Sequence, residues 1–338
     1  MASKPQGELL VGGQALIEGV MMRSPGAYGI AVRRPDGSIH RESARVPSLA
    51  ARYPFLKLPL LRGVAVLFQS LAIGIRALNV SALRAVEPAA SAAGSPPEIQ
   101  ADGARAPEPA ISSWAVASSM VVGLAFGVAF FLLLPLFLTQ LAERFLFGPL
   151  SSLAYNLIDG ALRAAFFLGY IVIISRLKDI HRVFMYHGAE HKVVFNHESG
   201  LPLSVENARA QSRLHPRCGT SFLLFVLLVS IFLFALIPKT APFVVKFGGR
   251  LLLVPLVAGL SYEVLRLTAQ RRAAPLFAAV VWPGLQLQKI TTQEPTDDML
   301  EVAIVALEEA LAADGLAPAP AAAPSPAAAA EIAAAASA

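Results

Sequence analysis

Long runs of apolar residues dominate the middle of the chain and predict membrane-spanning helices. Residues 114–138 form 25 positions without a charge, and a helix needs about 20 apolar residues to cross the hydrocarbon core of a bilayer. Similar runs cover 154–175, 220–238 and 248–267, although Glu263 lies inside the last of them. The pattern predicts a mostly α-helical, polytopic membrane protein with about four transmembrane helices.

Two further apolar segments fit the membrane surface better than a span. Residues 274–288 are short and contain Pro283, which is typical of a re-entrant or interfacial segment, with a fifth span as the alternative. Residues 60–83 have apolar positions at helical spacing but carry Arg62 and Arg76 within the pattern. Such a helix lies on a membrane more readily than it crosses one.

The ends of the chain have a different composition from its middle. Before the apolar runs, the Asp36-Gly37 pair stands between short extended stretches and predicts a β-hairpin, so we expect a small N-terminal α+β surface region. Segments rich in Ala, Pro and Ser predict a linker and a disordered tail. The expected units are residues 1–86 at the surface, a linker at 87–110, a transmembrane domain at 111–310 with a polar loop at 176–219, and an Ala/Pro tail at 311–338.

The low content of charged residues agrees with a membrane protein, and the distribution of Lys and Arg predicts its orientation in the membrane. Only 15% of the residues are charged, against about 25% in a soluble domain, which excludes an ordinary soluble enzyme. Lys and Arg number 12 before the first span, one in 139–153 and seven in 176–219. By the positive-inside rule, the N-terminus and the 176–219 loop are expected to be cytoplasmic. A net charge of +5 without a long basic block suits a lipid bilayer and not nucleic acid.

The candidate chemistry lies in the 176–219 loop. Five of the six histidines fall between residues 181 and 215, and the centre of the group is the segment 187–191, HGAEH. On a helix, His187 and His191 share a face and can bind one ion, while Glu190 stands beside them. In inverted zinc hydrolases this H-x-x-E-H order supplies two ligands and a carboxylate that takes a proton from water at the metal. The segment predicts a site for Zn²⁺ or another divalent metal, with Glu190 as the catalytic base.

Three residues are candidates for completing the ligand set. His215 and Cys218 stand three positions apart, and imidazole with thiolate suits zinc. If both join the histidines of 187–191, four ligands close the site and make it structural. Cys218 has an alternative role as a small residue packing where a helix enters the bilayer, and we favour a position near the metal but outside its ligand shell.

Glu263 is the third candidate. It follows His191 by 72 residues and would give a His/His/Glu site. A carboxylate inside a membrane is costly unless it is paired or functional, so the alternative is an ion pair with Arg266 or Arg163, which we favour slightly.

Several longer motifs together resemble the YqhQ-like membrane family, which occurs in bacteria and has plastid relatives. They are GGQALIEGVMMRSP (12–25), RVFMYHGAEHKVVF (182–195), SRLHPRCGTSF (212–222), VAGLSYE (257–263) and LQKITTQEPTDDMLEVAI (287–304). The resemblance covers about residues 8–310 and implies a protein of the bacterial inner (cytoplasmic) membrane. Members are labelled predicted metal-dependent enzymes, a label that rests on the same HGAEH segment. The family motifs also draw attention to Gln14, Glu18 and Arg23 and to Gln288, Thr291, Thr292 and Glu294, which either converge on the metal loop or act as turn and cap residues.

Two classes of function follow. The first is a membrane-embedded metal-dependent hydrolase at the cytoplasmic face, with Arg213 or Arg217 available for an anionic substrate group. The second is a non-enzymatic membrane scaffold or assembly factor with a structural metal site, which would bind membrane-protein partners or a second copy of itself. A weaker third class is a transporter that uses Asp159, Arg163 and Glu263 inside the membrane, and the absence of an inverted repeat disfavours it.

Overall fold

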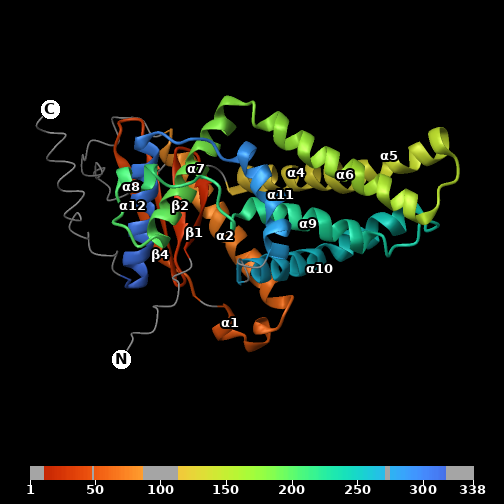
Figure 1. Ribbon diagram of the computed structural model, residues 1–338, viewed down its shortest axis with the longest axis horizontal. Helices are drawn as coiled ribbons and strands as arrows, with labels where there is room; N and C mark the ends of the chain where they lie inside the picture. Colours follow the sequence, from red (N-terminus) through yellow and green to blue (C-terminus); the bar gives the residue numbers. More distant parts are fainter. Residues whose placement is uncertain (1–10, 48, 87–112, 271–274, 317–338) are drawn as a thin grey trace, which may run out of the picture.

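The computed structural model describes residues 11–47, 49–86, 113–270 and 275–316. A small α+β unit lies at one end of a bundle of long apolar helices (Figure 1). The strands are β1 (Gly12–Leu16), β2 (Gly19–Arg23), β3 (Ala27–Arg33) and β4 (Ile39–Arg45). The helices of the first half are α1 (Leu49–Arg52), η1 (Pro54–Lys57), α2 (Leu61–Arg84), α4 (Ser113–Val128), η2 (Ala129–Leu133), α5 (Leu134–Ala142), η3 (Glu143–Phe147) and α6 (Ser152–Ile174). Those of the second half are α7 (Lys178–Glu198), α8 (Val205–Arg209), α9 (Gly219–Phe234), α10 (Phe243–Gln270), α11 (Pro275–Thr291) and α12 (Asp297–Asp314).

The four strands form an antiparallel meander in the order β1-β2-β3-β4. The predicted hairpin at Asp36-Gly37 is confirmed as the turn between β3 and β4. Gly37 has a φ of 84°, a backbone conformation that favours glycine. The Asp36 carboxylate accepts a hydrogen bond from the Ser38 backbone N–H at 2.9 Å, which fixes the turn locally.

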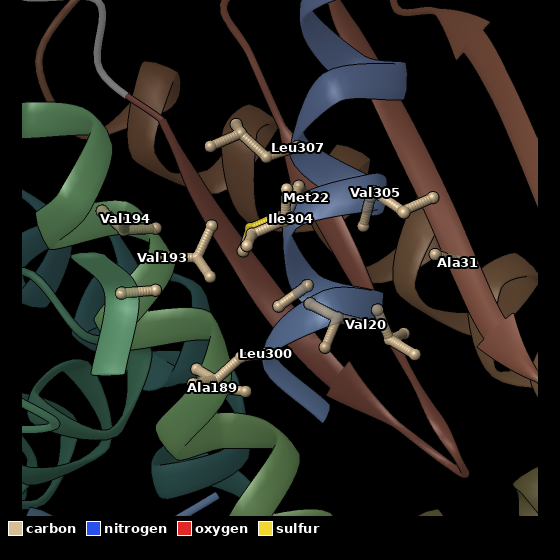
Figure 2. Packing of buried hydrophobic residues seen from close by; sticks show 14 of the residues in the cluster. Val20, Met22, Ala31, Ala189, Val193, Val194, Leu300, Ile304, Val305 and Leu307 are labelled. Carbon is tan, nitrogen blue, oxygen red and sulfur yellow. The ribbon is translucent and has the colours of Figure 1, made fainter. Parts of the chain in front are cut away.

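Both faces of the sheet are buried. Successive side chains of a strand point to opposite faces, so Met22 and Ala31 pack with α7 and α12 on one face (Figure 2). Met21 and Ile30 pack on the other face, where Ala77 of α2 joins them. The sheet is therefore the middle layer of a three-layer unit, and its central strands are apolar on both sides.

Helix α12 was not expected as an element of this unit. It follows Thr296, has two aspartates in its first turn, and ends at Gly315 with a φ of 76°, so both ends carry favourable helix signals. Its apolar face lies on the sheet (Figure 2). Residues 311–314 thus belong to a packed helix and not to the expected tail, while the linker at 87–110 and residues 317–338 lie outside the described residues.

Among the described residues, four helices are long and apolar enough to cross a membrane, by length and composition. This confirms the predicted polytopic helical fold with a small N-terminal sheet. The four are Leu61–Arg84, Val121–Phe147, Ser152–Ile174 and Phe243–Thr268. The segment predicted as a span at 220–238 forms the 16-residue α9, a shorter apolar helix that is not one of the four.

Helix α2 is one of the four, although its interior arginines led us to expect it at the surface. A Cβ on Gly63 would lie 2.8 Å from the Tyr262 side chain of α10, so the start of α2 packs closely against the bundle. Further along α2, Ala77 packs in the hydrophobic core on one face of the sheet. One helix therefore joins the sheet to the bundle.

Candidate metal centre

Three potential ligands of a metal ion meet at the junction between the sheet and the bundle. His187 and His191 lie on the same side of α7, as predicted from their spacing, with ring centroids 4.5 Å apart. Cys218, at the start of α9, brings its Sγ to 3.2 Å from His187 Nε2. One ligand atom from each of these residues lies within 4.8 Å of the other two.

Backbone carbonyls orient both imidazoles toward this cluster. His187 Nδ1 lies 2.8 Å from the Thr291 carbonyl oxygen, and His191 Nδ1 lies 2.5 Å from that of Arg213. A carbonyl can only accept, so each Nδ1 carries a hydrogen, and in the neutral imidazole the lone pair is then on Nε2. Outer partners of this kind fix the tautomer of metal-binding histidines.

His191 is held in the form that binds metals. Its Nε2 is buried and has no hydrogen-bond partner of normal geometry in the described part of the chain. Burial lowers the pKa of His191, although the neighbouring Cys218 side chain opposes this shift. Only the neutral imidazole binds a metal, so the environment of His191 fits a ligand.

Glu190 completes the predicted H-x-x-E-H arrangement. Its Oε2 atom lies 3.8 Å from His187 Nε2 and 3.6 Å from His191 Nε2. Burial raises the pKa of this carboxyl, while His187, His215 and a hydrogen bond from the Gly13 backbone oppose the shift. Strand β1 lies directly against it, because a Cβ on Gly13 would stand 2.8 Å from Glu190 Cγ.

His215 is close to the cluster but is turned toward other partners. Its ring centroid is 5.7 Å from that of His191. Its Nδ1 accepts a hydrogen bond from the Arg217 backbone N–H at 3.3 Å, and its Nε2 lies 3.6 Å from Glu198 Oε1. The closed set of four ligands is thus not assembled among the described residues, in which His187, His191 and Cys218 form the candidate group.

Glu263 is not brought to the cluster. Its carboxylate accepts hydrogen bonds from the Arg62 guanidinium, at 2.7 Å from Nε, and from the Leu60 backbone N–H at 3.4 Å. A charge-assisted, two-point pair with Arg62 satisfies the acid. The expected alternative of an ion pair is therefore present, but the partner comes from α2 and is neither Arg266 nor Arg163.

A pocket of about 390 Å³ opens over the cluster. The three ligand candidates and Glu190 line it together with residues 12–15 of β1 and Arg217. Arg217 pairs with Glu198, whereas Arg213 donates to the Thr292 carbonyl and lies 3.7 Å from Glu294. Of the two arginines expected to meet an anionic substrate, Arg217 is the one on the pocket wall.

The polar run at the C-terminal end of α11 and just beyond it converges on the metal loop, which is one of the two alternatives that the sequence left open. Gln288 is fully buried, accepts from the His215 backbone N–H at 2.8 Å, and donates to the His215 carbonyl at 2.8 Å. Thr291 and Thr292 offer their carbonyls to His187 and Arg213. Glutamine and threonine have no metal chemistry of their own, so the sequence alone could not distinguish these positioning roles from capping.

Gly188 within the HGAEH segment is a packing requirement. A Cβ at this position would stand 2.0 Å from the Gln293 carbonyl oxygen. Gly188→Ala should therefore force α7 away from the 293–295 segment and destabilise the protein by about 1–3 kcal/mol. The measurement is thermal unfolding of the purified protein in detergent. Gly169→Ala, where a Cβ meets nothing within 4 Å, is the matched control, and equal melting temperatures for both variants would contradict the steric explanation.

The fold and the cluster together define a helical membrane protein with a His/His/Cys group, suited to a metal, where its α+β unit meets the helical bundle. Residues 58–313 match the family described as "Protein of unknown function (DUF1385)", and the chain belongs to this family. It is 38% identical over 313 residues to the "Uncharacterized protein YqhQ" of Bacillus subtilis (strain 168), a match that covers 90% of this chain and 93% of the relative. These findings confirm the resemblance drawn from the motifs. No solved structure matches the chain.

Proposed function

We propose that the protein is a membrane-embedded, metal-dependent hydrolase, with Zn²⁺ as the metal. One observation carries the proposal: two imidazoles and a thiol converge within 4.8 Å on the wall of a pocket, and the Glu190 carboxylate stands beside them. Two nitrogens and one sulfur suit zinc better than harder cations. A set of three protein ligands leaves one position open, as in catalytic zinc sites.

His187, His191 and Cys218 would hold the metal through Nε2, Nε2 and Sγ. A divalent ion bound there would lower the pKa of water and polarise an acyl or phosphoryl oxygen. Glu190 would accept the proton of the attacking water, because its carboxylate faces the same pocket and burial raises its pKa, which makes it a stronger base than an exposed carboxylate. The carbonyls of Thr291 and Arg213 would keep both imidazoles aimed at the ion during turnover.

Metal content tests this proposal directly. Protein purified in detergent without chelators should contain about one Zn²⁺ per chain. His191→Ala should lose most of it, whereas His197→Ala, which removes a histidine of the same helix outside the candidate group, should retain it. Elemental analysis of the three proteins gives the stoichiometry. If the parent chain binds no divalent metal even after incubation with Zn²⁺, the proposal is wrong.

The proposed site is expected on the cytoplasmic side of the membrane. A reporter protein inserted after Ser199, at the end of α7, should be active in the cytoplasm, because residues 176–219 carry seven Lys and Arg and the segment 139–153 carries one. The measurement compares a cytoplasmic reporter with one that is active only after export. Activity of the exported reporter at Ser199 would invert the proposed orientation.

A further inference from the structure

A cluster of buried charges lies inside the helical bundle, away from the metal centre. Asp159 of α6 accepts from Arg163 at 2.5 Å, as the spacing of four residues allows, and from both terminal nitrogens of Arg250 at 2.9 Å. The exposed fractions of these three side chains are 3–5%. Lys246, one turn before Arg250 on α10, is also buried, and its Nζ lies 3.4 Å from the Tyr155 hydroxyl. Arg163 and Arg250 thus share one carboxylate, and a third buried cation lies one turn away.

The cations are not fully satisfied by their neighbours. Arg163 Nε and Arg250 Nε are buried and have no hydrogen-bond partner in the described part of the chain. The Phe234 ring lies 4.7 Å from the Arg163 guanidinium and 5.3 Å from that of Arg250, which offsets part of the cost of burying them. Buried charge that lacks a counter-charge is expensive in an apolar environment and marks a ligand or ion site more often than a stabilising feature.

An apolar cavity of about 460 Å³ lies beside this cluster. Its polar residues are Arg163, Ser230 and Tyr170, and the Arg163 guanidinium donates to the Ser230 hydroxyl at 3.1 Å. The rest of the wall is hydrophobic and comes from α2, η2, α6, α9 and α10. Along α9 the wall runs from Ser230 back to Phe222, a length of about 12 Å at the helical rise per residue. The cavity is lined almost entirely by apolar side chains, and Arg163 is the cationic residue on its wall.

We propose that this cavity binds a single-chain anionic amphiphile. Its carboxylate or phosphate would sit at Arg163 and Ser230 and supply the counter-charge that the cluster lacks. Its hydrocarbon chain would lie along α9 toward Phe222. The volume is in the lower part of the range for small-ligand sites, about 300–1,000 Å³, and therefore favours one chain over a two-chain lipid. This site is separate from the metal centre and does not depend on its chemistry.

Binding of radiolabelled palmitate tests the proposal, with the full-length protein in phosphatidylcholine nanodiscs. We expect saturable binding that lysophosphatidate displaces and that the uncharged hexadecanol does not. Displacement by lysophosphatidate at lower concentration than by unlabelled palmitate would identify phosphate as the preferred headgroup, and the reverse would identify carboxylate. Absent or unsaturable binding, or equal displacement by hexadecanol, would overturn the proposal.

Two variants separate the anion site from the chain site. Arg163→Gln removes the cation on the wall, and Ala258→Phe fills the cavity while leaving every charge in place. Each should weaken palmitate binding at least tenfold. Leu252→Phe, on the same helix but 80% exposed on the outside of the bundle, is the control and should bind as the parent does. If Arg163→Gln does not fold, Ala258→Phe decides alone, and unchanged affinity in that variant would overturn the proposal.

Discussion

Glu190→Gln should abolish the function of the protein while leaving its metal in place. Glutamine keeps the size and hydrogen-bonding shape of the side chain but cannot accept the proton of water, and a positioned general base contributes about 10²–10⁴-fold to a rate. The carboxylate is not one of the three ligand candidates, so metal stoichiometry and thermal stability should be close to those of the parent. The measurement is complementation of a deletion strain, with elemental analysis of the same purified variant.

Glu206→Gln is the control for this experiment. Glu206 is an exposed residue of α8 and belongs neither to the candidate ligand group nor to the lining of the pocket. Loss of function in Glu190→Gln alone would support an enzyme. Full complementation by Glu190→Gln would exclude the hydrolase and favour a scaffold whose metal only braces the junction between α7, α9 and α11.

The local parts of the site were predictable because short-range rules determine them. The spacing of His187, Glu190 and His191 places all three on one side of any helix, and the turn at Gly37 follows from its dipeptide. The start of α8 is similarly local, since the Ser204 side chain accepts a hydrogen bond from the Asn207 backbone N–H at 3.2 Å and caps the helix. These features depend on residues within one or two turns of each other, so the sequence alone specifies them.

The assembly of the site depends on contacts that sequence spacing does not encode. Glu263 and Cys218 were both chemically reasonable as the third ligand of the metal. Which of them is free to bind it depends on the residue of α2 that packs against Glu263 in α10. Arg62 of α2 takes the Glu263 carboxylate, which leaves Cys218 beside the histidines. Helix α12 was missed for a related reason. Its apolar residues are buried by strands almost 300 positions earlier in the chain, and the sequence does not show that contact.

The position of the metal centre has a physical explanation in the way the layers meet. Helix α7 packs on the sheet through Ala189 and Val193 (Figure 2), so the opposite side of α7, with its histidines, faces the ends of α9 and α11. Those ends supply Cys218 and the Thr291 carbonyl. The ligands therefore meet only when the α+β unit is docked on the bundle, which couples the site to the junction of the two.

Cys218→Ser should sharply reduce metal affinity if the thiol is a ligand. Serine is nearly the same size but is a far poorer ligand for zinc than thiolate. The loss should exceed the roughly 10–100-fold typical of removing an outer partner of a metal ligand. Thr220→Val provides that comparison, because the Thr220 hydroxyl lies 3.2 Å from Cys218 Sγ and only supports it. The measurement is competition for Zn²⁺ against a chelating dye, with each variant purified in detergent.

Alkylation of Cys218 gives an independent measurement on the unmodified chain, because it is the sole cysteine. A metal-bound sulfur reacts slowly, so a maleimide should label the metal-loaded protein slowly and the chelated protein quickly, with metal released as labelling proceeds. Cys218 would be removed from the ligand set if Cys218→Ser bound Zn²⁺ with unchanged affinity and if chelation left the rate of maleimide labelling unchanged. The site would then rest on His187 and His191, and Glu190 beside them would become the nearest carboxylate able to act as a ligand, which is incompatible with its proposed role as a free base.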